Sequence, residues 1–171
     1  MVIVWRPYLL RPDMPPEGME IPSEYQDEME DTHARLRKMA GTGGLPMVFS
    51  GRIPNSRLAL EATEYANAQG RGNEFHRAVF NKLYGEGLNI GSWEVLKAAA
   101  AEAGIDGDKM QAEGAGDKYA ALLEWKLAEA VTLGIKAVPT CVINGSHHIV
   151  GAQPYEVFKE AIAALDPEIP K

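Results

Sequence analysis

The chain has 171 residues, of which 46% are hydrophobic and 24% are charged, and its formal net charge is −7. This length and composition predict one soluble globular domain that can bury a core without a disulfide or a metal ion. The negative charge disfavours nucleic acids and anionic membranes as partners, and no apolar run approaches the roughly 20 residues that span a bilayer. The N-terminus lacks a signal-peptide pattern, and one cysteine, Cys141, cannot form an internal disulfide. We therefore expect a cytoplasmic protein, because single unpaired cysteines suit a reducing compartment.

The first expected element is a strand at residues 2–10, which is rich in β-branched and aromatic side chains but contains a proline. A proline-rich loop follows at residues 11–22. Ser23 and Gln26 have the spacing of a capping box, which predicts a helix that ends near Met39.

Several further helices are predicted from the helical spacing of apolar residues and from residues that favour N-caps. Asn55 is expected to cap a helix that ends near Gln69. The others begin near Gly72, Trp93 and Asp117, and a short helical turn follows Asp106. In the longest of these helices we expect the core-facing side chains to be Leu122, Leu123, Leu127 and Val131.

The C-terminal part begins with Gly134, which ends the longest helix, and continues with Val138–Pro139 at the entrance of an apolar run, 140–143. Proline is tolerated at the first residue of a strand, and this X-Pro bond is a candidate for the cis form. Asn144-Gly145 is a strong hairpin signal, which predicts that residues 147–150 return as a second strand. The final helix should begin at Pro154 and turn Tyr155, Phe158, Ile162 and Leu165 toward the core.

Cys141 has two interpretations. Its position near the proline loop would suit a thiol that attacks or holds a disulfide. Free cysteine is, however, among the residues most often buried, so we expect Cys141 to act as a small hydrophobic side chain in the core.

Five segments resemble, in the right order, the DsbA-like thioredoxin fold in its branch of FrnE-type dithiol oxidoreductases and 2-hydroxychromene-2-carboxylate isomerases. These segments are residues 5–18, 52–60, 75–84, 134–141 and 151–154. The resemblance implies an α/β, thioredoxin-like fold formed by residues 1–22 and 134–171, with an inserted helical subdomain at 23–133. The first strand of that family, with its Cys-x-x-Cys or serine motif, is absent from this sequence.

The resemblance implies thiol–disulfide exchange, in which a thiolate attacks a disulfide held against the proline loop. Without the Cys-x-x-Cys motif we expect no redox activity from this chain itself. The alternatives are a relative of glutathione-dependent isomerases or kappa-type glutathione transferases, and a non-catalytic, dimeric binding protein. The substrate-binding candidates are Val138, Pro139 and Asn55, the nucleophile is unknown, and Cys141 is the one candidate for it.

The expected partners are a thiol or disulfide peptide, or glutathione as a substrate, with no cofactor and no nucleic acid or membrane. No metal site is expected, since His147 and His148 point to opposite faces of a strand. A homodimer is expected because residues 2–5 and 140–143 both offer open strand edges. The alternative is a monomer in which these two strands pair with each other.

Overall fold

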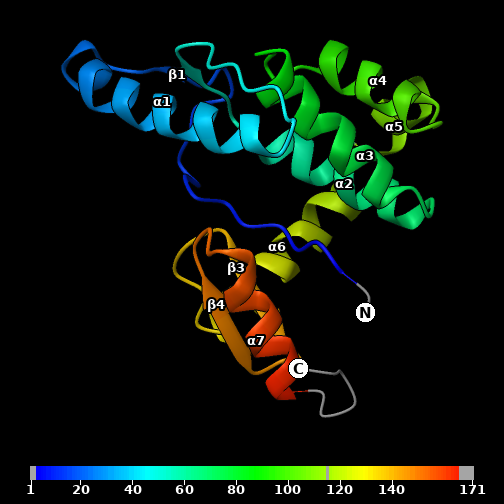
Figure 1. Cartoon of the computed structure of the whole chain (residues 1–171). Helices are drawn as coiled ribbons and strands as arrows, with labels where there is room; N and C mark the ends of the chain where they lie inside the picture. The colour runs from blue at the N-terminus through cyan, green and yellow to red at the C-terminus, as the bar shows by residue number, and fades with distance from the viewer. Residues whose placement is uncertain (1–2, 115, 166–171) are drawn as a thin grey trace. The chain divides into compact units, whose positions relative to one another are not determined.

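The computed structural model describes residues 3–114 and 116–165. It divides into two compact units, Met1–Lys126 and Leu127–Lys171 (Figure 1). The first unit is mainly helical and contains nearly all of the buried side chains. The second consists of a hairpin and a helix that follow the end of a longer helix.

The N-terminal segment runs extended without forming a strand, so the prediction of a strand at residues 2–10 is wrong for its described part, 3–10. A strand needs a neighbour that pairs with its backbone, and none is paired with this segment among the described residues. The sheet of the first unit lies elsewhere, where β1 (Met19–Glu20) pairs antiparallel with β2 (Arg52–Ile53). The sequence did not indicate this short ladder.

The first long helix, α1 (Gln26–Thr42), confirms the predicted helix but begins differently. A turn of 3-10 helix, η1 (Ser23–Tyr25), precedes it, and its N-cap is Tyr25, without a capping hydrogen bond from a side chain. Ser23 is therefore not the N-cap that was predicted, because it lies within the 3-10 turn, and the Gln26 side chain of the predicted capping box lies outside the described part of the chain. The buried His33 of α1 stacks on Phe49, with 3.6 Å between the ring centroids.

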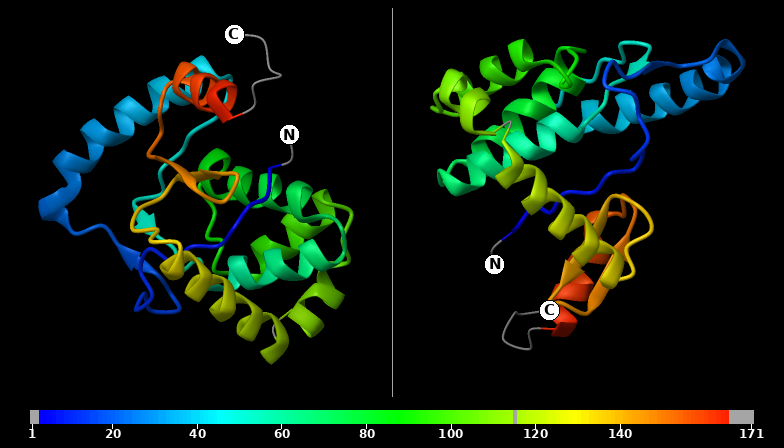
Figure 2. Two further views of the ribbon diagram at one scale, coloured as in Figure 1. Left: turned by 90° about the horizontal axis from the view of Figure 1, so that it is seen from below. Right: turned by 180° about the vertical axis from the view of Figure 1, so that it is seen from behind.

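Four helices form the core of the first unit, three of them predicted as helices and the fourth, α5, expected only as a short turn. They are α2 (Arg57–Ala68), α3 (Gly72–Phe80), α4 (Trp93–Glu102) and α5 (Gly107–Gly114). Helix α2 packs against α3 and α5, while α4 packs against α3 and α5 (Figure 2). Their facing surfaces are rich in alanine, which lets the backbones approach closely. The fully buried residues include Ala62, Phe75, Leu96, Ala99 and Met110.

The helix predicted to begin at Asp117 is confirmed as α6 (Asp117–Thr132), but with 16 residues it is one shorter than the 17-residue α1, so the prediction that it is the longest is wrong. Tyr119 and Leu123 are buried, and the ring of Tyr119 meets that of Tyr65 edge-on at 5.6 Å. Val131, expected to face the core, is 74% exposed. This residue lies in the small second unit, where no described element covers its side chain.

The second unit contains the predicted hairpin of β3 (Thr140–Ile143) and β4 (His147–Val150), followed by α7 (Tyr155–Leu165). Asn144 and Gly145 have φ of 50° and 74°, and the Ser146 N–H donates to the Ile143 carbonyl at 3.2 Å. The sequence explains this turn, because asparagine and glycine tolerate positive φ.

Helix α7 has no fully buried residue, which differs from the expectation that four of its side chains face a core. Tyr155 is 74% exposed and Leu165 is also exposed, whereas Phe158 and Ile162 are partly buried. In the described part of this unit the buried side chain is Ile149. A two-stranded hairpin and one helix offer too little apolar surface to enclose more.

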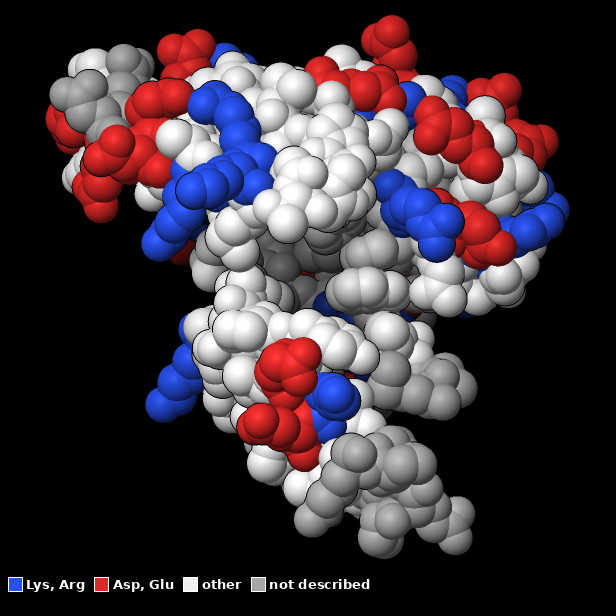
Figure 3. Space-filling view, viewed as in Figure 1, with Lys and Arg blue, Asp and Glu red and all other residues white. Residues whose placement is uncertain are grey.

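The surface of the first unit carries acidic and basic side chains side by side (Figure 3). On the face shown, an uncharged area covers the C-terminal end of α1 and the loop after it. Met39 of α1 and Leu45 and Val48 of that loop are exposed. No helix in the described parts of the chain is both long and apolar enough to span a membrane.

Candidate functional site

The proline loop joins α6 to β3 and is held in place at both ends. The peptide bond between Val138 and Pro139 is cis, which is the isomer expected from the sequence. The Thr140 hydroxyl donates to the Ala137 carbonyl at 2.6 Å, and the Gly151 N–H donates to the Pro139 carbonyl at 2.8 Å. These two hydrogen bonds fix the loop in front of β3.

Val138 is a residue of this loop whose backbone is open. Its side chain is 45% exposed, and within residues 3–114 and 116–165 its N–H and C=O make no hydrogen bond. An unpaired N–H and C=O can pair with a peptide as a neighbouring strand does. This geometry suits the substrate-binding role expected for Val138 and Pro139.

Cys141 lies two residues after Pro139 and is exposed, so the expectation of a buried cysteine is wrong. It faces Ile149 across the hairpin. The two-stranded hairpin has no further strand beside β3 in the described chain, which leaves the cysteine accessible to solvent. An external thiol or disulfide can therefore reach it.

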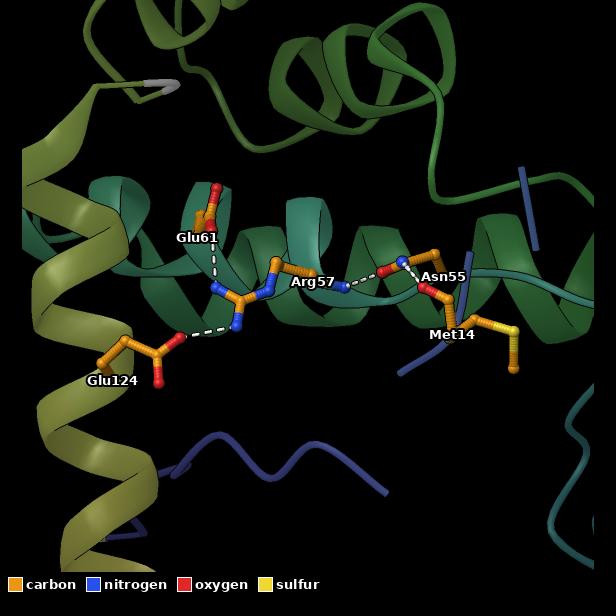
Figure 4. A network of polar contacts seen from close by, with 5 residues as sticks. All are labelled: Met14, Asn55, Arg57, Glu61 and Glu124. Atoms are coloured by element: carbon orange, nitrogen blue, oxygen red, sulfur yellow. Dashed lines mark hydrogen bonds and ion pairs between the residues drawn. The ribbon is translucent and has the colours of Figure 1, made fainter. Parts of the chain in front are cut away.

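Asn55 has its whole side-chain amide engaged in bonds within the first unit (Figure 4). Its Nδ2 donates to the Met14 carbonyl at 2.7 Å and to the Pro15 carbonyl at 3.3 Å, while its Oδ1 accepts from the Arg57 N–H at 2.8 Å. Asn55 thus ties the proline-rich loop to the start of α2. Val138, Pro139 and Cys141 lie together in the second unit, and Asn55 does not belong to that group.

Arg57 is a polar residue that sequence reasoning missed (Figure 4). Its guanidinium donates to Glu124 of α6 at 2.5 Å and to Glu61 at 3.5 Å. The hydrogen bond with Glu124 raises the pKa of Arg57, so the side chain stays cationic. The spacing of Arg57 and Glu61, four residues apart on one helix, was the available signal for part of this network.

The four histidines do not form a metal site. The described residues contain no group of three His, Cys, Asp or Glu side chains placed to hold an ion. His147 and His148 line a shallow hollow of about 450 Å³ between β4 and α7, together with Gln153 and Glu160.

A model of the DSBA-like thioredoxin domain matches residues 1–163. The chain belongs to this family. The uncharacterised protein YwbO of Bacillus subtilis strain 168 is 29% identical over 164 residues, which are 94% of this chain and 80% of YwbO.

Two solved structures share the fold. One is a probable DsbA oxidoreductase, SCO1869 of Streptomyces coelicolor, with a TM-score of 0.85 and 22% identity over 97% of this chain and 76% of that one. The other is a 2-hydroxychromene-2-carboxylate isomerase, with a TM-score of 0.72 and 19% identity over 85% and 71% of the two chains. The expected family and the α/β, thioredoxin-like fold class are thereby confirmed.

Proposed function

We propose that this DsbA-family protein binds thiol- or disulfide-containing peptides, glutathione included, against the backbone of Val138 and forms a mixed disulfide through Cys141. The observation that carries the proposal is the exposure of Cys141 two residues after the proline of the loop. The single exposed thiol also suits a reducing compartment, so we assign the protein to the cytoplasm.

The proposed step is one thiol–disulfide exchange. The Cys141 thiolate attacks one sulfur of a bound disulfide, a new S–S bond forms to Cys141, and the other sulfur leaves as a thiolate. A second thiol must attack this mixed disulfide before the protein can react again. Because the chain has one cysteine, it cannot complete this cycle from its own residues.

The first experiment separates a single exchange from catalysis. Incubation with oxidised glutathione should add one glutathionyl group to the intact protein, as measured by mass spectrometry, and Cys141→Ser should abolish the addition. In an insulin-reduction assay with dithiothreitol, the rate should equal that of the blank. Turnover above the blank that disappears in Cys141→Ser would contradict the proposed absence of a catalytic cycle.

The role of the Val138 backbone can be tested with a matched pair of variants. Val138→Pro removes the N–H, whereas Val138→Ala retains it. Loss of one hydrogen bond to the bound peptide should slow mixed-disulfide formation by about 2- to 10-fold in the proline variant. Circular dichroism should show an unchanged fold in both. Equal rates in the two variants would exclude the Val138 N–H from binding.

A relative of glutathione-dependent isomerases or kappa-type glutathione transferases is the second candidate. The open backbone at Val138 suits it too, since glutathione is itself a short peptide with a thiol. Calorimetry with reduced glutathione discriminates between the candidates. Binding that survives in Cys141→Ser, without formation of a mixed disulfide, would favour this second candidate.

A non-catalytic, dimeric binding protein is the third candidate, and it rests on the open edges of the hairpin. Within the described chain, β3 and β4 pair only with each other, so each has one unpaired edge. Such edges readily pair with another chain. About a two-fold axis, the unpaired backbone groups of one strand can bond to those of the same strand in a second copy. Light scattering should then give twice the 18.6 kDa of one chain. A mass of 18.6 kDa at all concentrations would contradict the dimer.

A further inference from the structure

Three aromatic rings, spaced four residues apart along α3 and the π-helical turn η2 (Asn81–Gly85), form a ladder with Trp5 of the N-terminal segment. The indole of Trp5 stacks on the imidazole of His76, with centroids 4.1 Å apart and planes inclined by 16°. The imidazole meets Phe80 at 4.4 Å, and Phe80 meets Tyr84 at 5.8 Å. His76 is therefore enclosed between two larger rings.

The Trp5–His76 stack attaches residues 3–5, whose backbone forms no β-ladder and which precede the buried Pro7. Among the described residues no backbone hydrogen bond is found to residues 3–5, and the neighbouring Arg6 has an interaction of its own. Ile3 and Val4 are 61% and 65% exposed. What holds these residues on α3 is thus side-chain contact and not a β-ladder.

The same segment forms one wall of a cleft of about 400 Å³. Ile3, Val4 and Trp5 line it on one side. The other lining residues are Asn67, Gly70, Gly72, Asn73, Glu74 and Lys126. The ammonium of Lys126 bonds the carboxylate of Glu64, which is 2% exposed, so the cleft lies against a buried ion pair.

His76 is partly buried, and this burial lowers its pKa from the ordinary value of 6.5. No charged group contributes to that shift. The charged residues of the elements around it are Glu74 and Arg77 on α3, Arg71 before α3, Arg6 beside Trp5, and the Lys126–Glu64 pair at the cleft. Glu74 is paired with Arg71, and Lys126 with Glu64, so neither carboxylate is free to stabilise an imidazolium.

We propose that Trp5 and His76 form a pH-dependent latch that holds residues 3–5 on α3 and that acidification releases these residues and opens the cleft beside Lys126. The neutral imidazole tolerates the space between the two rings, whereas the imidazolium has to give up part of its hydration to remain there. Release of the segment restores that hydration. The latch is closed above pH 6.5 and opens as the pH falls through the lowered pKa of His76.

The latch can be measured by the accessibility of Trp5 to a neutral quencher. The chain has three tryptophans, so the double variant Trp93→Phe/Trp125→Phe leaves Trp5 as the only reporter. Acrylamide quenching is measured from about pH 8 to about pH 5, the range in which histidines titrate. The quenching constant should rise about twofold on acidification, because Trp5 is 52% exposed when the latch is closed.

Two further variants of this reporter protein identify the titrating group. His76→Phe keeps a flat ring in the stack but cannot be protonated, so its quenching constant should stay low at every pH. His33→Gln removes the buried histidine of α1, which stacks on Phe49, and should leave the transition unchanged. Circular dichroism at each pH establishes that all three proteins remain folded.

Three outcomes would overturn the proposal. One is quenching that does not change with pH in the reporter protein. Another is a transition that persists in His76→Phe or disappears in His33→Gln. The third is quenching that decreases at low pH, because attraction between an imidazolium and the indole would then hold the segment more tightly.

Discussion

At the scale of single residues, Asn55 shows how one side chain can join segments distant in the sequence. Its amide donates to the proline-rich loop, 41 residues away at Met14, and accepts from the backbone at the start of α2. A residue that was predicted to bind substrate is thus fully occupied with internal bonds.

We expect Asn55→Ala to lower the free energy of unfolding by about 1–3 kcal/mol, because it leaves partly buried backbone groups of the loop and of α2 without partners. Urea unfolding measures this difference. The control is Asn73→Ala at an exposed position, which should change stability by less than about 0.5 kcal/mol. Equal losses in the two variants would contradict the role given to Asn55.

Two phenylalanines on the same helix provide a second test at this scale. Phe75 is 0% exposed in the core, whereas Phe80 is 51% exposed. Phe75→Ala should destabilise the protein by about 3–5 kcal/mol through the cavity it creates. Phe80→Ala should cost far less, as it removes only ring contacts at the surface. Thermal or urea unfolding measures the stability lost in each variant. Similar losses would contradict the assignment of Phe75 to the core and of Phe80 to the surface.

At the scale of elements, the short β1–β2 ladder depends on a glycine that no other residue can replace. Gly18 precedes β1 with φ of 73°, and a Cβ built on it would lie 2.5 Å from the Ile53 carbonyl oxygen of β2. That approach is impossible without a shift of the backbone.

Gly18→Ala should therefore destabilise the protein by more than the roughly 1–2 kcal/mol that a left-handed backbone conformation costs alanine. Gly44 is the matched control, since its φ is 69° and a Cβ there would meet nothing within 4 Å. Gly44→Ala should show the conformational cost alone. If the two variants lose the same stability in urea unfolding, the close approach at β2 is not important.

The helices could be predicted from the sequence, whereas the strands near the N-terminus could not. Phe75 and Val79 lie four residues apart on α3 and are both buried, as this spacing predicts. The two-residue strands β1 and β2 are too short for an alternating pattern. The β-type residues at 3–5 favour an extended backbone but do not supply a partner to pair with.

The candidate site was predicted in part. The proline loop and hairpin follow from local turn chemistry, which the sequence displays directly at Val138–Pro139 and Asn144-Gly145. The exposure of Cys141 does not follow from local sequence, because its burial depends on how many neighbouring strands and helices surround β3. Arg57 was missed because its main partner, Glu124, lies 67 residues away in the sequence.

At the scale of the whole molecule, the buried side chains are distributed very unevenly. The core cluster lies entirely in the first unit, in and around α2 to α5, while the described part of the second unit buries Ile149. Local stability follows the amount of buried apolar contact, so the two units should differ in how readily they open.

Native-state hydrogen exchange tests this difference. The slowest amides should belong to α2 and α4, around Ala62 and Ala99, whereas those of β3, β4 and α7 should exchange at least about 100-fold faster. A comparison at two pH values controls for the mechanism of exchange. Protection in β3 equal to that in α2 would contradict a stability difference between the units.

The network around Arg57 and Asn55 also has a consequence for the order in which the chain folds. It joins the proline-rich loop and α6 to the same end of α2, through contacts that span 41 and 67 residues. Closing such long loops costs conformational entropy before any contact is gained, whereas α2 to α5 pack with near neighbours in sequence. The four core helices should thus assemble first, and the first and last parts of this unit should join an already formed helical platform.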